Sequence, residues 1–237
     1  MKLTYLFNSG FVIESDRFMI MPDYFKDTVD GFAHQALTSY PGQIYVLASH
    51  WHPDHFNREI MRWKEQRPDI HYVFSEDIRN QMKWMNFPDV VFLDKGQEWE
   101  DNMLYVKAFG STDVGISFLI EADDKRIFHA GDLNNWHWNE EVTPEESQAA
   151  ERDFLNELSF MAETTTQFDL AMFPVDPRLG KDYMLGAQQF VERFETKVFA
   201  PMHFGDSYDK ANAFRPFAQQ AGCRFIGWKT RGETIEF

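Results

Sequence analysis

Residues 49–56 read Ser49-His50-Trp51-His52-Pro53-Asp54-His55-Phe56, which puts three histidines and one aspartate within six positions. The apolar run 44–48 comes directly before them and predicts a buried β-strand that ends at the cluster. Imidazole nitrogens and carboxylate oxygens are ligands that zinc and similar divalent ions prefer. The stretch therefore predicts a metal site at the carboxyl end of a buried strand, with His50, His52, Asp54 and His55 as ligands.

The spacing of these four ligands also bears on the number of metal ions. Four side chains this close along the chain cannot all converge on one ion without strain, so the spacing favours two adjacent metals. The alternative is that they are unrelated core or surface residues. A lone histidine would favour that alternative, whereas four coordinating side chains at a strand end favour the metal site.

The composition is that of a globular chain with an aromatic interior. Of the 237 residues, 43% are apolar and 16% are aromatic. This length predicts a single domain over residues 1–237. The formal net charge of −15 disfavours a nucleic-acid partner, because there is no surplus of Lys and Arg to neutralise phosphates.

We base the expected cellular compartment on sequence features that would mark a secreted or membrane protein. Cys223 is the one cysteine, so no disulfide within the chain is possible. The first residues reach the polar Asn8-Ser9-Gly10 too soon for a signal peptide, and no apolar run is long enough to cross a bilayer. We expect a soluble cytoplasmic protein with no membrane partner, and the sequence leaves the oligomeric state open.

The order of the expected elements indicates an α/β protein. Helices are expected after Asn57, over 76–84, after the capping box 143–146, over 181–196 and through 213–217, and 27–43 is expected to be irregular. Strands are expected at 3–7, 11–14, 17–21, 44–48, 70–74, 90–93, 103–109, 115–121, 126–129, 170–175, 198–200, 224–228 and 233–237. Two packed sheets with helices outside account for this order. Polar residues again follow strand ends at Asp23, Asp132, Asp176 and His203, where functional groups of such folds collect.

Together these residues resemble the metallo-β-lactamase superfamily of metal-dependent hydrolases. The motif His50-x-His52-x-Asp54-His55, followed by Gly131-Asp132 and the late His203, carries the resemblance. It implies a four-layer αββα sandwich of two mixed β-sheets with helices outside. It also implies that His50 and His52 bind a first metal, that Asp54, His55 and His203 bind a second, that Asp132 bridges both and that Asp23 orients the cluster.

Two further segments are similar to one branch of the superfamily, and one residue departs from the superfamily's usual metal ligands. Segments 109–113 and 175–180 are similar to the branch that includes ascorbate-6-phosphate lactonase-like proteins. The superfamily usually supplies a third histidine to the first metal, and Ser111 stands at that position here. We therefore expect the second site to bind metal more tightly. Asp113 and His129 are the alternatives for the missing ligand, with a supporting role in the strand favoured for His129.

The expected chemistry is hydrolysis by a metal-activated water. A bound divalent ion lowers the pKa of water and polarises the electrophile, and Asp54 is our choice for the general base. Zinc is expected, one or two ions per chain, with manganese or iron as alternatives. The expected substrate is a small-molecule ester, lactone or phosphoester. The alternatives are a phosphodiesterase or nuclease of the same fold, and a member that binds metal or ligand without turnover.

Residues beside the expected ligands are candidates for the substrate pocket. Trp136, His137 and Trp138 follow Asp132 closely, and the indoles suggest an apolar wall or lid. Ordinary aromatic packing is the alternative. Arg178 and Lys181 lie near Asp176, where the choice is between an anion site and solvated surface charge, and the surface charge is favoured.

Overall fold

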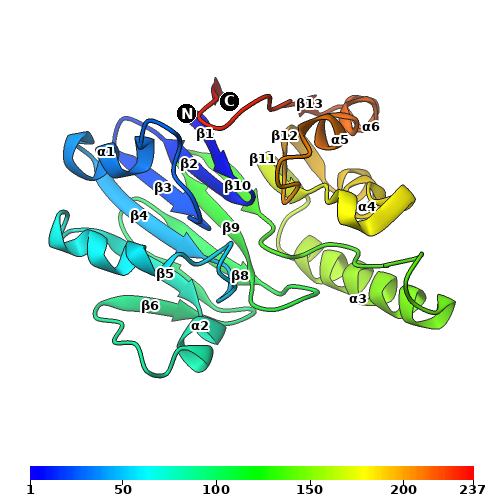
Figure 1. Cartoon of the computed structure of the whole chain (residues 1–237), viewed down its shortest axis with the longest axis horizontal. Coiled ribbons are helices and arrows are strands. Elements are labelled where there is room, and N and C mark those ends of the chain that lie inside the picture. The colour runs from blue at the N-terminus through cyan, green and yellow to red at the C-terminus, as the bar shows by residue number, and fades with distance from the viewer. The chain divides into compact units, whose positions relative to one another are not determined.

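The computed structural model describes residues Met1 to Phe237 and consists of two compact units (Figure 1). The first comprises Met1–Asp94 and Trp228–Phe237, and the second comprises Lys95–Gly227. Each unit contains one seven-stranded sheet. The single domain over residues 1–237 stays a prediction. No helix combines the length and apolar character that a bilayer-spanning segment needs.

The sheet of the first unit is mixed and has the strand order β14-β1-β2-β3-β4-β5-β6. Neighbours from β14 to β3 are antiparallel, and neighbours from β3 to β6 are parallel. The strands are β1 (Lys2–Phe7), β2 (Gly10–Glu14), β3 (Phe18–Pro22), β4 (Gln43–Ala48), β5 (His71–Ser75), β6 (Val90–Leu93) and β14 (Thr234–Glu236).

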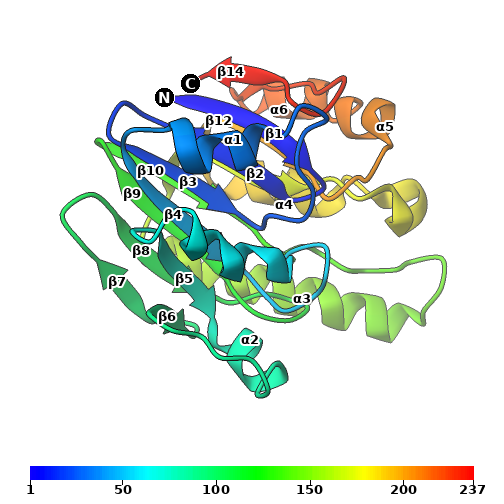
Figure 2. The same cartoon turned by 60° about the vertical axis from the view of Figure 1, so that its left-hand side comes forward.

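Helices cover one face of this first sheet, as Figures 1 and 2 both show. They are α1 (Phe32–Ser39), the 3-10 helix η1 (Arg58–Glu65) and α2 (Glu76–Gln81). Leu37 of α1, Trp63 of η1 and Ile78 of α2 belong to one apolar cluster with Val46 of β4 and Phe74 of β5. Burial of this shared face is what holds the three short helices on the sheet.

The sheet of the second unit has the order β13-β12-β11-β10-β9-β8-β7 and is also mixed. Its β7 to β10 are antiparallel neighbours and β10 to β13 are parallel neighbours. The strands are β7 (Glu98–Glu100), β8 (Tyr105–Phe109), β9 (Ser117–Ala122), β10 (Lys125–His129), β11 (Gln167–Pro174), β12 (Glu195–Met202) and β13 (Arg224–Phe225).

Aromatic side chains attach the helices of the second unit to its sheet. These are α3 (Pro144–Ala162), the 3-10 helix η2 (Pro177–Asp182), α4 (Leu185–Arg193), α5 (Tyr208–Asn212) and α6 (Arg215–Gln220). Phe190 of α4 stacks on Phe173 of β11 with ring centroids 4.5 Å apart, and Phe154 of α3 lies 6.2 Å from the same ring. Such pairs add to the apolar burial in a preferred geometry.

The parallel strands explain where the polar residues gather. A parallel strand is buried on both faces and therefore has a continuous apolar sequence, as in β4, which is buried from Ile44 to Ala48. Adjacent parallel strands end at the same edge of the sheet. In the first unit Asp23 and His50 follow β3 and β4, and in the second Asp132, Asp176 and His203 follow β10, β11 and β12.

The prediction of two mixed sheets with helices is confirmed, and two of the local expectations are wrong. Helix α1 lies in the stretch expected to be irregular. Its N-cap is Gly31, without a side-chain cap, and Asp27 further upstream accepts the N–H groups of Ala33 and His34 instead. The helix expected at 181–196 is η2, α4 and the start of β12, because the chain becomes extended at Phe194. The helix expected after Asn57 is present as a 3-10 helix, and Asn57 caps it as expected.

Candidate metal centre

The first unit brings six polar residues together after β3 and β4, and we call them the His50–His55 cluster. Asp23 is their centre. Its carboxylate accepts the backbone N–H of Ser49, the hydroxyl of Ser49 and Nδ1–H of His55, each at 2.7 Å. Asp23 and His55 are both fully buried. The members of the cluster are Asp23, Ser49, His50, His52, Asp54 and His55.

These hydrogen bonds decide which nitrogen of each imidazole carries a proton. The Ser49 hydroxyl donates to Asp23, so at 3.0 Å it can only accept from Nδ1–H of His50. His55 likewise donates from Nδ1 to Asp23. When these rings are neutral, Nε2 is therefore the nitrogen without a proton. A metal-ligating histidine is held in this way, with its second nitrogen donating to a carboxylate or another acceptor.

The ligand atoms are spaced as a metal would require. Nε2 of His50 lies 3.0 Å from Nδ1 of His52, and Nε2 of His55 lies 3.6 Å from Oδ2 of Asp54. Two ligands about 2.0 Å from a tetrahedral zinc stand about 3.3 Å apart. The residues of the first unit thus fit two chelating pairs, one of two imidazoles and one of an imidazole and a carboxylate.

The second unit contains a smaller group that we call the Asp132–His203 cluster, made of Asp132, Asp176, Arg178 and His203. Nε2 of His203 lies 3.2 Å from the Asp132 carboxylate, and its Nδ1 lies 3.0 Å from Asp176. Asp176 is 1% exposed. It stands to His203 as Asp23 stands to His55, because each buried carboxylate takes the Nδ1 proton of a histidine that follows a strand.

Asp176 also binds Arg178, and its pKa reflects both partners. Burial by itself raises the pKa of a carboxyl, but hydrogen bonds from His203 and Arg178 hold the pKa of Asp176 below its usual value. The Arg178 Nε lies 3.0 and 2.8 Å from the two carboxylate oxygens. Asp176 is therefore an ionised acceptor between His203 and Arg178.

The backbone turns sharply where these residues leave their strands. Asp23 has φ 46° and His203 has φ 60°, in the left-handed region that residues with a Cβ seldom occupy. Gly131, before Asp132, has φ 53°. Strained residues of this kind persist where surrounding contacts hold them and are common at functional sites.

The remaining predicted site residues have local roles or stand beside the clusters. The Ser111 hydroxyl accepts the N–H of exposed Asp113 at 3.3 Å. His129 is buried and its Nδ1 accepts the N–H of Gly131, which shapes the turn before Asp132. His137 is buried too, and donates from Nε2 to the Asp182 carbonyl at 3.2 Å. Trp136 donates from Nε1 to the Asp132 carbonyl at 2.8 Å.

Sequence reasoning missed three residues that hold the His50–His55 cluster. Asn8 donates to the Asp54 carboxylate at 3.0 Å, Ser49 links Asp23 to His50, and Asp77 accepts the N–H of Trp51 at 3.1 Å. Burial raises the pKa of Asp77. Ser49 directly precedes His50 and was open to inference, whereas Asn8 and Asp77 come from distant segments without a motif.

Cys223 is no candidate nucleophile. The side chain is buried, and burial raises the pKa of its thiol to about 11. A thiol in such surroundings stays protonated near neutral pH and is unreactive. Cys223 therefore has a structural role.

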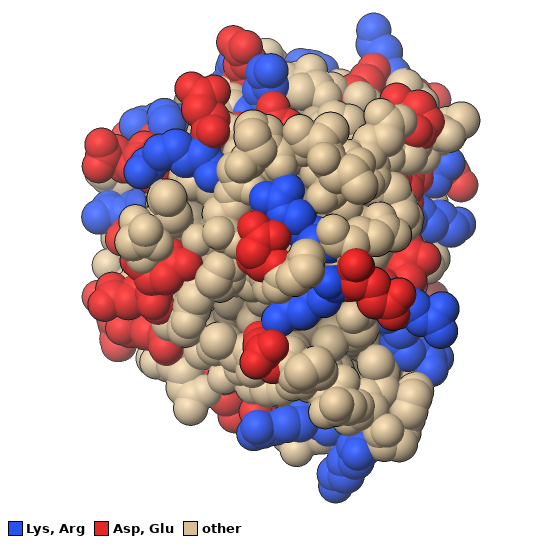
Figure 3. Space-filling model, turned by 90° about the vertical axis from the view of Figure 1, so that its left-hand side faces the viewer, with Lys and Arg blue, Asp and Glu red and all other residues tan.

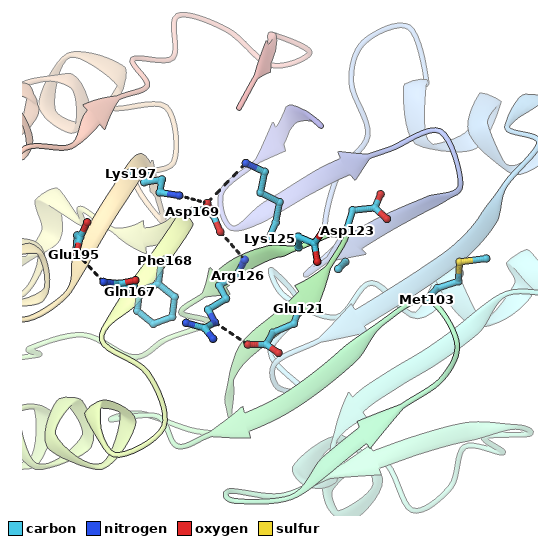
Figure 4. Close-up of a pocket in the computed structure, with 12 residues that line it drawn as sticks. Met103, Glu121, Asp123, Lys125, Arg126, Gln167, Phe168, Asp169, Glu195 and Lys197 are labelled. Carbon is cyan, nitrogen blue, oxygen red and sulfur yellow. Dashed lines mark hydrogen bonds and ion pairs between the residues drawn. The ribbon is translucent and has the colours of Figure 1, made fainter.

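A cavity of about 500 Å³ lies at the opposite ends of the strands of the second sheet, where β10, β11 and β12 begin (Figure 4). Each of its basic side chains pairs with a carboxylate. Lys197 binds Asp169 at 2.8 Å and Arg126 binds Glu121 at 2.9 Å. Because these opposite charges bind each other, they do not converge on a ligand as catalytic groups would. We therefore do not assign this cavity to the candidate centre.

Comparison with solved structures shows which fold these two units form. A metallo hydrolase from the archaeon Ignicoccus hospitalis is 20% identical over 100% of this chain and 98% of its own, with a TM-score of 0.69. The metallo-β-lactamase fold protein YhfI from Bacillus subtilis is 13% identical over 99% of both chains, with a TM-score of 0.67. The chain has the metallo-β-lactamase fold. No protein-family model matches it, and no curated protein matches its sequence.

Proteins with the metallo-β-lactamase fold differ in their metal chemistry. The diiron β-hydroxylase CmlA from Streptomyces venezuelae has a TM-score of 0.66 and is 13% identical over all of this chain, which spans 54% of CmlA. The fold alone therefore decides neither the metal nor the reaction. The narrower similarity to ascorbate-6-phosphate lactonase-like proteins stays a prediction.

Proposed function

We propose that this protein is a metal-dependent hydrolase that acts on a small ester, lactone or phosphoester. The observation that carries the proposal is the pair of buried carboxylate–histidine contacts, Asp23–His55 and Asp176–His203, at 2.7 and 3.0 Å. Each directs an Nε2 lone pair toward a neighbouring carboxylate, Asp54 or Asp132. A lone pair that faces a carboxylate gains nothing from it, so a divalent cation between the two groups would suit this arrangement better.

We assign the ligands as the resemblance implies. By that resemblance, His50 and His52 would hold a first ion, Asp54, His55 and His203 would hold a second, and Asp132 would be shared. When bound, the ions supply Lewis acidity and lower the pKa of water. Because Ser111 stands at the usual third-histidine position, the first ion would have two histidines and Asp132, and we expect the second ion to bind more tightly. Zinc is our first choice because the donors are imidazole and carboxylate, and manganese and iron suit similar donors.

The side chains of this protein divide the remaining work. Asp54 is 40% exposed, so it is open to solvent and to a substrate, and Asn8 holds one of its oxygens at 3.0 Å. We assign it as the base that takes the proton of the attacking water. Asp23 and Asp176 keep the Nδ1 protons of His55 and His203 in place and touch no substrate.

The distribution of charge supports a small substrate over a nucleic acid. The net charge is −15, and on the face in Figure 3 basic and acidic side chains intermingle without a continuous basic stripe. A binder of phosphate backbones concentrates Lys and Arg along its contact surface.

Metal analysis tests the proposal first. Protein purified without added metal, and after incubation with zinc, manganese or iron, should hold at least one ion per chain by plasma mass spectrometry. Absence of any bound or rebound ion would overturn the hydrolase assignment.

Turnover tests it second. The Asp54→Ala variant should lose hydrolysis of a panel of lactones, esters and phosphodiesters by at least about 100-fold, the lower range for a general base. Asp69→Asn is the matched control, since Asp69 is an exposed aspartate of the same unit that pairs with Arg67. Unchanged turnover in Asp54→Ala would contradict the assignment of the base.

A further inference from the structure

Two features border the His203 ring within the second unit. The terminal Nη2 of Arg178 lies 3.3 Å from Nδ1 of His203, and the Trp136 ring meets the His203 ring edge-on with centroids 5.8 Å apart. Trp138 stacks on Trp136 at 6.2 Å with an interplanar angle of 15°. A guanidinium and a pair of parallel indoles therefore lie beside one candidate metal ligand.

The guanidinium is both held and accessible. Asp176 binds it through Nε and Nη2 from the buried side, while 62% of the Arg178 side chain is exposed. A planar guanidinium fixed in this way loses little further freedom when it binds a carboxylate or phosphate. It is the natural place for an anionic group of a ligand beside the Asp132–His203 cluster.

The segment that carries the two indole side chains is also held in place by hydrogen bonds. Trp136 is fixed by its bond to the Asp132 carbonyl. Trp138 has φ 41°, a conformation that is costly for a bulky residue. His137 and Asn139, which flank Trp138, each bond to Asp182 of η2, the element that also carries Arg178. The strain is thus maintained by contacts between the two segments that present the indoles and the guanidinium.

We propose that Arg178 and the Trp136–Trp138 pair form the recognition face of the site and select an aryl-substituted oxyanion. The phosphate or carboxylate of the substrate pairs with Arg178, and its flat apolar group packs on the indoles. As a statement about substrate selection, the inference rests on the proposed hydrolase function. Binding to the face itself needs no turnover.

Calorimetric titration of the full chain with three probes tests this face, with and without EDTA. The probes are phenylphosphonate, methylphosphonate and benzyl alcohol. In EDTA, phenylphosphonate should bind about tenfold more tightly than methylphosphonate, and benzyl alcohol should bind most weakly. Equal affinities for the two phosphonates would overturn the aromatic part of the proposal.

Variants separate the two halves of the face. Arg178→Gln should weaken phenylphosphonate at least tenfold and bring it to the level of benzyl alcohol. Trp138→Asn should bring phenylphosphonate to the level of methylphosphonate, which itself stays unchanged. Asn is chosen because it tolerates a left-handed backbone. Lys197→Gln and Trp84→Phe are the controls, since these exposed residues lie outside the face.

The outcomes distinguish this inference from the proposed function. If the probes discriminate in EDTA but the metal-loaded protein hydrolyses nothing, the recognition face stands and the hydrolase assignment falls. The opposite outcome is that the protein hydrolyses simple esters while both variants, Arg178→Gln and Trp138→Asn, are folded by circular dichroism and bind all probes as the unmodified chain does. In that case the inference is wrong and the proposed function stands.

Discussion

Replacing Asp23 by asparagine tests the central geometric argument of the candidate centre. Asp23 accepts three hydrogen bonds of 2.7 Å, and one oxygen, Oδ2, takes both the Ser49 hydroxyl and Nδ1–H of His55. In the Asp23→Asn variant an NH₂ group replaces one of the two carboxylate oxygens. If the new amide keeps its oxygen on the Ser49 N–H, its NH₂ group faces His55 Nδ1 and requires that nitrogen to accept.

The consequence for metal binding follows from the tautomer. His55 would carry its proton on Nε2, the nitrogen that we propose as the metal ligand. Loss of such an outer partner weakens metal binding about 10- to 100-fold, which corresponds to about 1.4–2.8 kcal/mol. The metal-free fold should also lose about 1.5–3 kcal/mol, since a buried hydrogen bond to a charged group is removed.

Zinc competition against a chromophoric chelator measures the first effect, and urea unfolding in EDTA measures the second. Asp27→Asn is the matched control. Asp27 is also a hydrogen-bonded carboxylate of the first unit, but it binds the start of α1, so its variant should lose stability and keep zinc affinity. Wild-type zinc affinity in a folded Asp23→Asn variant would refute the tautomer argument.

Two further predictions concern the second unit. Gly110→Ala should lower the free energy of unfolding in urea by about 1–3 kcal/mol. The reason is that the Cβ of the new alanine would lie 2.8 Å from the Glu157 carboxylate, which accepts the N–H of residue 110. An unchanged urea midpoint would contradict this prediction. Burial opposes ionisation of Asp169, but hydrogen bonds from Lys197 and the Arg126 backbone hold its pKa below the usual value. A lowered carboxyl pKa stabilises the fold above the unfolded pKa of about 4, and this stability is lost as the pH falls through the folded value. Lys197→Gln should therefore be less stable than the unmodified chain at pH 7, and the difference should vanish at acid pH; a difference that persists there would be inconsistent with this ion pair.

Much of the fold was predictable because apolar periodicity is a local property. The runs that became β3, β4 and β10 stand out, and so does the capping box of α3, in which Thr143 and Glu146 exchange hydrogen bonds. Helix α1 was not predictable, because the side chain that caps it, Asp27, lies outside the usual N-cap position. The end of α4 was predicted too late in the chain, because pairing of β12 with β11 places residues from Glu195 onward in the sheet.

For the candidate centre, the sequence by itself determined the kinds of donor and their places after strands. Imidazoles and carboxylates that directly follow buried strands indicate a metal without any coordinates, as at His50, Asp132 and His203. The resemblance to the metallo-β-lactamase superfamily added that Ser111 stands where a third histidine is usual. These are statements about residue identity and order, which the chain carries locally.

Only the tertiary structure decided which nitrogen each histidine presents and what stands beside it. The contacts of Asp23 with His55 and of Asp176 with His203 join residues 32 and 27 positions apart. The same holds for the approach of Arg178 and Trp136 to the His203 ring. Hydrogen-bond direction depends on the position of the partner in space, and no pattern along the chain specifies it.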